Sequence, residues 1–129
     1  TQRLAAAGKI AAAGYPLGFI IAPLFLYKHW QADYRKLLED LAVWVQPHHP
    51  PSLSFELISH RFTARAKKVI LERFPHTQLE MNEEKRKLKW GKYGYGKYLY
   101  PPDQLETLKN WFTQEIGRLF PQAEIEYFT

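Results

Sequence analysis

Residues 17–22, LGFIIA, and residues 53–59, LSFELIS, decide the fold of this chain. The first run is apolar throughout and lies between Pro16 and Pro23, so we expect a strand that is covered on both faces. The second run alternates in part and predicts a strand parallel to the first. Between them, residues 30–45 carry apolar side chains at helical spacing. The order strand, helix, strand predicts an α/β fold with right-handed crossovers and a mostly parallel sheet.

Three further helices are expected around these strands. Residues 2–13 are rich in strong helix formers and precede a glycine suited to a helix end. A helix over residues 63–74 should turn three apolar side chains inward: Val69, Ile70 and Phe74. The last helix should run to residue 119, with Asp103 as its N-cap and Glu106 completing a capping box.

Residues 123–128, AEIEYF, alternate and predict a strand at the edge of the sheet. Three sheet strands are too few to close a barrel, and an open sheet this small would leave apolar strands half covered. We therefore expect one domain over residues 1–129, forming the C-terminal part of a larger, partial β/α (TIM-like) barrel. The chain starts on helix-like sequence without Met, which also indicates a fragment of a longer protein.

Composition excludes several classes of protein. Hydrophobic residues make up 46% and charged residues 24% of the 129, which is typical of a globular domain. The chain has no cysteine, so it cannot supply a disulfide, a thiolate metal ligand or a cysteine nucleophile. The longest apolar run, residues 14–27, contains two prolines and is shorter than the ~20 residues of a membrane helix. We expect a cytoplasmic monomer with no membrane contact.

Positive charge is concentrated in one segment. The net charge is +5, and residues 85–97 hold six basic residues and no acidic one: Lys85, Arg86, Lys87, Lys89, Lys92 and Lys97. Aromatic residues interleave with them, namely Trp90, Tyr93, Tyr95, Tyr98 and Tyr100. Lysines alone would fit a solvated charged face, but planar rings beside cations are what stacked bases and phosphates require. Glycines at 91, 94 and 96 favour a β-hairpin within residues 83–100.

Two strand ends are candidate ligand sites, because ligands gather beyond the carboxyl ends of parallel strands. At Ala22 a small residue could leave the backbone free to face a cofactor such as an adenine ring, or it could simply be well packed. At the second end, His60 should titrate near neutrality and Arg61 could fork onto a phosphate or carboxylate. Polar residues that cap the next helix would give the same pattern. His48 and His49 lack further ligands at metal spacing, so we expect them in a solvent-facing loop.

Long blocks of the chain resemble the spore photoproduct lyase family. The likeness is strongest in EEKRKLKWGKYGYGKYLY (residues 83–100) and extends through AAAGKIAAAGYPLGFIIAPLF, FELISHRFTARAKKVILERFP and FPQAEIEYFT. The resemblance implies a radical S-adenosylmethionine enzyme that reverts the thymine dimer of ultraviolet-damaged spore DNA to two thymines. It also implies the partial β/α barrel that the element order favours. The matching blocks correspond to the family's C-terminal portion.

The resemblance also implies a division of labour. The cysteines that bind the family's [4Fe–4S] cluster, its hydrogen-donating cysteine and its relay tyrosines belong to an N-terminal half that this chain lacks, so the chain alone should be inactive. Lys92 and Tyr93 match an Arg-Tyr pair that contacts the lesion, and Lys replaces the bidentate Arg. Ala22 matches a place where the backbone lines S-adenosylmethionine. The partners implied are damaged double-stranded DNA and the missing N-terminal half.

The expected task of this chain is lesion recognition. A thymine dimer stacks poorly and costs less to flip out than a normal base, and Trp90 and Tyr93 could fill the gap. Lysines of the hairpin segment would neutralise the flanking phosphates, namely Lys85, Lys87, Lys89 and Lys97. Tyr95 would lie beside them. Two alternatives remain from sequence: a complete, non-enzymatic nucleic-acid-binding α/β module, and a β/α fragment whose basic hairpin binds a protein.

Overall fold

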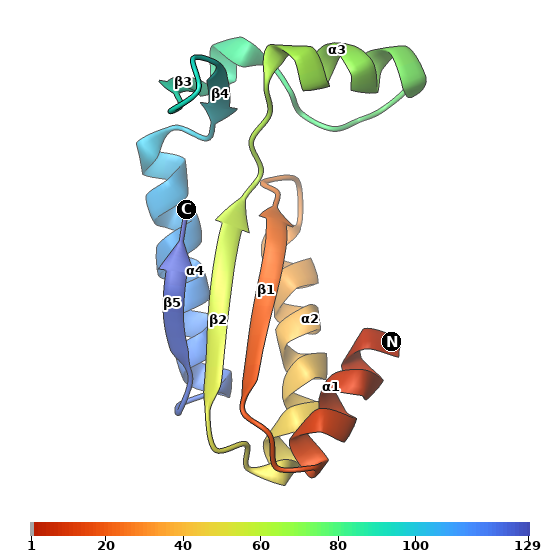
Figure 1. The fold of residues 1–129 in the computed structure, drawn as a ribbon, viewed down its shortest axis with the longest axis vertical. Helices are drawn as coiled ribbons and strands as arrows, with labels where there is room; N and C mark the ends of the chain where they lie inside the picture. Colours follow the sequence, from red (N-terminus) through yellow and green to blue (C-terminus); the bar gives the residue numbers. More distant parts are fainter. Residues whose placement is uncertain (1) are drawn as a thin grey trace.

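A computed structural model describes residues 2–129 and has a three-stranded parallel sheet at its centre (Figure 1). The strands are β1 (Leu17–Leu24), β2 (Leu53–Ser59) and β5 (Glu124–Phe128), in the order β1-β2-β5. Both neighbouring pairs are parallel, so the predicted parallel sheet is confirmed, and β5 lies at an edge as expected. β1 continues through Pro23 to Leu24, beyond the predicted end, with a register shift between Ile21 and Leu24.

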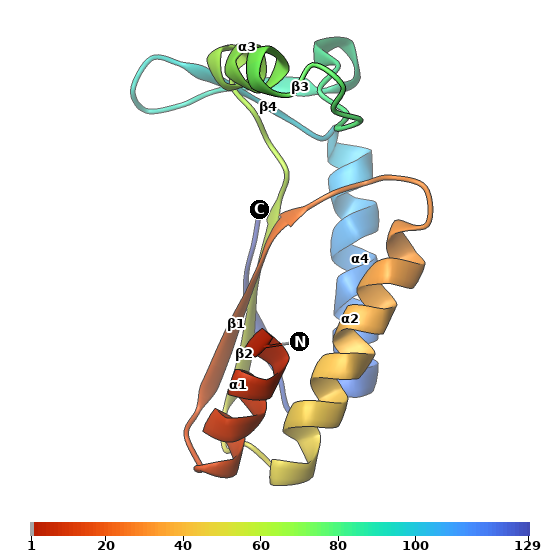
Figure 2. The same cartoon turned by 90° about the vertical axis from the view of Figure 1, so that its right-hand side faces the viewer.

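Four α-helices lie within residues 2–129. They are α1 (Gln2–Ala12), α2 (Trp30–Val45), α3 (Ala64–Arg73) and α4 (Pro102–Leu119), with short 3-10 turns at Gln46–His48 and Glu83–Lys85. In Figure 2, α2 and α4 stand side by side against one face of the sheet, and α1 lies against the lower part of α2. α3 lies apart from them, beyond the carboxyl ends of β1 and β2. None of the helices within residues 2–129 is long and apolar enough to cross a membrane.

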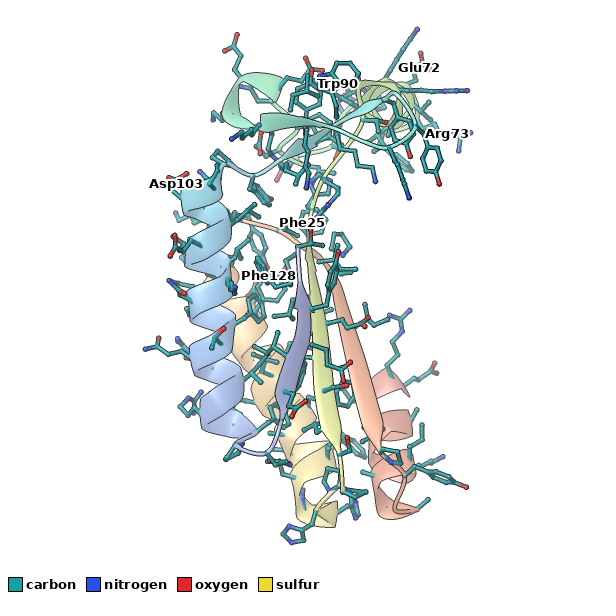
Figure 3. All side chains as sticks on the ribbon, turned by 60° about the vertical axis from the view of Figure 1, so that its left-hand side comes forward. Phe25, Glu72, Arg73, Trp90, Asp103 and Phe128 are labelled. Atoms are coloured by element: carbon teal, nitrogen blue, oxygen red, sulfur yellow. The ribbon has the colours of Figure 1, made fainter. Side chains whose placement is uncertain are left out.

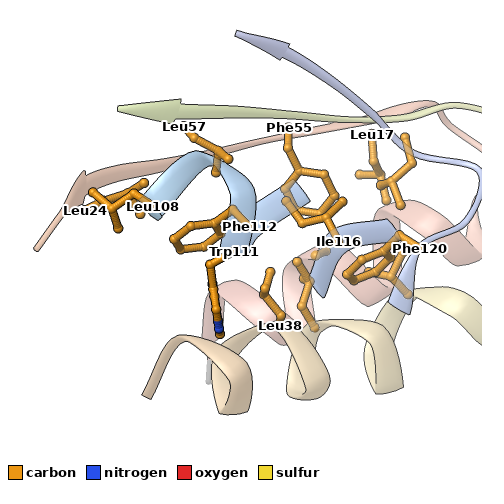
Figure 4. Close-up of a cluster of buried hydrophobic side chains, with 14 of the residues drawn as sticks. Leu17, Leu24, Leu38, Phe55, Leu57, Leu108, Trp111, Phe112, Ile116 and Phe120 are labelled. Atoms are coloured by element: carbon orange, nitrogen blue, oxygen red, sulfur yellow. The ribbon is translucent and has the colours of Figure 1, made fainter. Parts of the chain in front are cut away.

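The hydrophobic core fills the space between the sheet and the two long helices (Figure 4). Phe55 of β2 points into it and its ring lies 5.3 Å from that of Phe120. Phe112 of α4 is fully buried and its ring lies 5.3 Å from that of Tyr34 on α2. These contacts fix both helices against the strands, and so fix where the strands' carboxyl ends lie.

The opposite face of the sheet is open in the described part of the chain. On β1, Phe19 and Ile21 pack against the core, whereas Ile20 points the other way and is 67% exposed. The prediction that β1 is covered on both faces is therefore wrong for this chain, because α2 and α4 cover the same side. An apolar run shows that both faces of a strand can be buried, but it does not contain the element that buries them.

Two details of the helices also differ from the predictions. α3 has no buried residue, and Val69 and Phe74 are 38% and 64% exposed, so the expected inward face is wrong. α4 begins at Pro102, its N-cap is Pro101, and no side chain caps it, so the Asp103 N-cap and its capping box are wrong. Proline fits the first turn of a helix because its fixed φ is helical and its missing N–H needs no partner there.

Candidate nucleic-acid interface

The basic segment folds as an antiparallel hairpin of β3 (Lys87–Trp90) and β4 (Gly96–Leu99). Lys89 faces Lys97 across the two strands, and Trp90 faces Gly96. In the connecting turn the Gly91 N–H donates to the Tyr95 carbonyl oxygen at 2.9 Å, and Gly94 has a φ of 77°, which glycine adopts without strain. The hairpin lies beyond the carboxyl end of the sheet, beside α3 (Figure 1).

Three aromatic rings of the hairpin are presented to solvent. Trp90 is 68%, Tyr93 81% and Tyr95 47% exposed. A contiguous patch of exposed apolar side chains with a polar rim is typical of an interaction site. The Lys97 ammonium lies 5.9 Å from the centre of the Tyr95 ring, so one cation already stands beside one of these faces.

Exposed lysines surround the three rings. Lys87, Lys89 and Lys92 are exposed, and Lys97 is partly buried. The structure thus brings together seven of the eight residues singled out from sequence, and the eighth, Lys85, is exposed in the 3-10 turn just before β3. The seven are Lys87, Lys89, Trp90, Lys92, Tyr93, Tyr95 and Lys97. Their contact with DNA or with a lesion stays a prediction.

Three other members of the segment turn inward. Arg86 is only 7% exposed and Tyr100 only 3%, and the Tyr98 ring stacks on that of Phe62 with centroids 5.2 Å apart. The expectation that Arg86 belongs to the cationic surface is therefore wrong. A run of basic residues does not show which of them finds a partner inside the fold.

Charge is segregated along the molecule. Residues 60–100 contain eleven Lys and Arg but four Asp and Glu, a net charge of +7, whereas the remaining residues sum to −2. Part of this excess lies on and just before α3, at Arg61, Arg65, Lys67, Lys68 and Arg73. The end of the molecule that carries α3 and the hairpin is thus a positive surface suited to a polyanion.

The two polar residues after β2 do not lie free at the strand end. His60 is 7% exposed, and burial, with a further contribution from the neighbouring Arg86 guanidinium, lowers its pKa to about 4. The prediction that His60 titrates near neutrality is therefore wrong. Arg61 is half-buried and donates to the Thr129 hydroxyl at 3.1 Å, and burial lowers its pKa. Contact of either residue with a substrate stays a prediction.

Ala22 lies near the carboxyl end of β1 and is exposed. It alternates with Ile21 and falls on the open face of the sheet, as Ile20 does. Its role as a cofactor contact stays a prediction. His48 and His49 are exposed in the loop before β2.

Sequence reasoning missed a buried cluster under the hairpin. It is formed by His60, Phe62, Glu80, Arg86 and Tyr100, drawn from four separate segments. Glu80 lies in an irregular segment that carries no periodicity, so its pairing with Arg86 could not be predicted.

Comparison with known proteins agrees with this arrangement. The family model described as spore photoproduct lyase matches residues 1–129. The spore photoproduct lyase of Bacillus subtilis (strain 168) is 48% identical over 128 residues, which are 99% of this chain and 37% of that protein. That of Geobacillus sp. (strain Y412MC61) is 46% identical over 127 residues. The chain spans little more than a third of the length of these relatives.

Solved structures give the same result for the fold. A spore photoproduct lyase with bound AdoMet and dinucleoside spore photoproduct matches with a TM-score of 0.91 and 46% identity. Another, complexed with dinucleoside spore photoproduct, matches equally well. Both matches cover 98% of this chain and 37% of the solved chain.

Proposed function

This chain belongs to the spore photoproduct lyase family, and we propose that it is the carboxyl-terminal, DNA-holding part of an enzyme that repairs the spore photoproduct. The observation that carries the proposal is the hairpin: three exposed rings among lysines, at the positive end of the molecule. Aromatic platforms beside a cationic surface are how proteins hold unstacked bases together with their phosphates.

The open face of the sheet supports a partial β/α barrel in the whole enzyme. β1 and β5 are edge strands, and Ile20 is exposed on the uncovered face. We propose that strands from the rest of the polypeptide continue the sheet, so that this face lines the interior. The hairpin within residues 83–100 would then stand at the mouth of the barrel, where ligands of such folds bind.

We propose that the hairpin recognises the lesion by filling the gap in the duplex and by binding the flanking phosphates. A dimer that stacks poorly leaves the duplex at low cost, and Trp90 and Tyr93 are exposed enough to fill the gap. Lys92 and Tyr93, side by side in the turn, would contact the damaged dinucleotide. The remaining hairpin cations would neutralise flanking phosphates: Lys87, Lys89 and Lys97. Tyr95 would add a stacking surface held beside Lys97.

The cofactors divide between this chain and the rest of the enzyme. A solved relative binds AdoMet, which supplies the hydrogen-abstracting chemistry of such enzymes, and the small, exposed Ala22 would leave room for its flat adenine. A [4Fe–4S] cluster does not fit this chain, which has no cysteine, so the cluster would be held elsewhere in the polypeptide. His60 and Arg61 lie at the carboxyl end of β2 and are candidate contacts to the substrate. We propose a cytoplasmic monomer acting on double-stranded DNA.

A chimera tests the proposal. This chain replaces the matching segment of the Bacillus subtilis lyase, and repair of the spore photoproduct in duplex DNA is measured. The unsubstituted chimera should be active, and Lys92→Ala with Tyr93→Ala should lower kcat/KM by about a hundredfold, if each lost contact is worth about 1–2 kcal/mol. Lys9→Ala with Tyr15→Ala is the control, since both are exposed and far from the hairpin. An inactive chimera, or equal activity of the two double variants, would contradict the proposal.

A further inference from the structure

The buried Arg86 makes four polar contacts in addition to its packing against aromatic rings. Its side chain is wholly inaccessible, and its Nε donates to Glu80 Oε2 at 2.9 Å. Its terminal nitrogens donate to the backbone oxygens of His60 and Glu80 at 3.1 and 2.9 Å, and one lies 3.1 Å from His60 Nδ1. A guanidinium can only donate, so this last contact requires an unprotonated Nδ1. The buried charge is thus paired with one carboxylate, and four of its five N–H groups have a hydrogen-bond partner.

These partners come from both ends of the hairpin and from the end of the sheet. Glu80 precedes β3, Tyr100 follows β4, and His60 directly follows β2. The Arg86 guanidinium carbon lies 3.8 Å from the centre of the Tyr100 ring. Because the planar fork bonds in fixed directions, it sets the angle between the segments it joins, which a lysine could not do. The Arg86 side chain therefore connects the base of the hairpin to the carboxyl end of β2.

A series of ring contacts, one tilted and two stacked, continues this link in both directions. The His60 ring lies 4.8 Å from that of Phe25, in the loop after β1, and 6.1 Å from that of Phe62. Phe62 in turn stacks on Tyr98 of β4 and pairs with it through two backbone hydrogen bonds. In Figure 3, Phe25 lies at the sheet end and Trp90 lies beyond it on the hairpin.

We propose that Arg86 is a positioning residue that holds the hairpin at a fixed angle over the carboxyl end of the sheet, and that this matters more for lesions in duplex DNA than for a free dinucleoside. The inference rests on the proposed function. A lesion in a duplex has to be drawn out and kept over the open face of the sheet against the stiffness of the flanking helix. A free dinucleoside has no flanking helix that resists extrusion, so it depends on the hairpin only through Lys92 and Tyr93. Misplacement of a reacting group by about 1 Å can cost roughly a hundredfold in rate.

The experiment compares two substrates in the chimera with the Bacillus subtilis lyase. Arg86→Lys keeps the charge and loses the fork. Its kcat/KM should fall about tenfold or more on duplex DNA carrying the spore photoproduct, and by no more than about threefold on the dinucleoside spore photoproduct. Arg118→Lys is the matched control, because Arg118 forms exposed ion pairs with Glu115 and Glu39 on the far side of the core. It should leave both substrates unchanged.

A second variant and a second readout keep a folding defect apart from a positioning role. Glu80→Gln keeps one acceptor oxygen for Arg86 Nε and removes the opposite charge, together with the second oxygen that accepts from the Asn82 N–H, so it should give a weaker loss with the same substrate selectivity. Hydrogen exchange at amides 87–99 should quicken in both variants while exchange in β2 stays unchanged. An equal loss on both substrates, or no loss on duplex DNA, would overturn the role of Arg86. An unsubstituted chimera that repairs neither substrate would instead refute the proposed function beneath it.

Discussion

Lowering the pH should reduce the free energy of unfolding because of one residue, His60. His60 is buried, its Nδ1 faces the Arg86 guanidinium, and the opposing effect of Glu80 is smaller, so its pKa lies at about 4. In the unfolded chain the same imidazole binds a proton below about pH 6.5. Between those two values the unfolded state binds more protons than the folded one, so the free energy of unfolding falls as pH falls. Above pH 6.5 the effect vanishes.

The magnitude follows from the shift. Each pKa unit corresponds to about 1.4 kcal/mol, so the free energy of unfolding should fall by up to about 3 kcal/mol from pH 7 to pH 4 on account of His60. Urea unfolding at half-unit pH steps measures it. His60→Asn offers a non-titrating acceptor to Arg86, and its slope over the same window should be shallower by that amount. Parallel pH profiles for the two proteins, or an imidazole that titrates near pH 6.5 by NMR, would refute the reasoning.

Three further outcomes are expected. Phe112→Ala empties a fully buried site and should cost about 3–5 kcal/mol in urea unfolding, with a cost below 1 kcal/mol contradicting the described core. Gly94→Ala should cost about 1 kcal/mol because φ is 77° there, whereas Gly117→Ala in α4 should be neutral or stabilising by up to about 1 kcal/mol; the reverse order would count against the turn. If about four phosphates are neutralised, a plot of log affinity for duplex DNA against log salt concentration should have a slope near −3.6. Lys89→Gln removes one of these contacts, so the slope should change to about −2.7. An unchanged slope would show that Lys89 does not contact the DNA.

Much of the sheet layer could be predicted from sequence because its signals are local. The helix over Trp30–Val45 and the strand over Leu53–Ser59 have the predicted bounds, since each combines a clear periodicity with breakers at its ends. The parallel pairing followed from the alternation of strands and helices. Burial was harder, because it depends on what packs against an element: α3 is amphipathic in sequence and yet has no buried residue.

Only the solvent-exposed residues of the candidate site could be predicted from the sequence. Rings and lysines near the turn, such as Trp90 and Lys92, are exposed as their polar, glycine-rich surroundings suggested. Arg86 has the same sequence neighbourhood, but its partners Glu80 and His60 come from other segments. A side chain that is paired at long range leaves no trace in a local pattern, and so the support of the hairpin became visible only in the structure.

The central claim is that the hairpin holds damaged DNA through its exposed rings, and relative affinity tests it most directly. The measurement is the ratio of this chain's affinity for a duplex with one spore photoproduct to its affinity for the same duplex undamaged, at fixed salt. Trp90→Ala with Tyr93→Ala should bring that ratio close to one, while affinity for undamaged DNA, set by the lysines, changes little. A ratio that survives the loss of both rings would contradict the account.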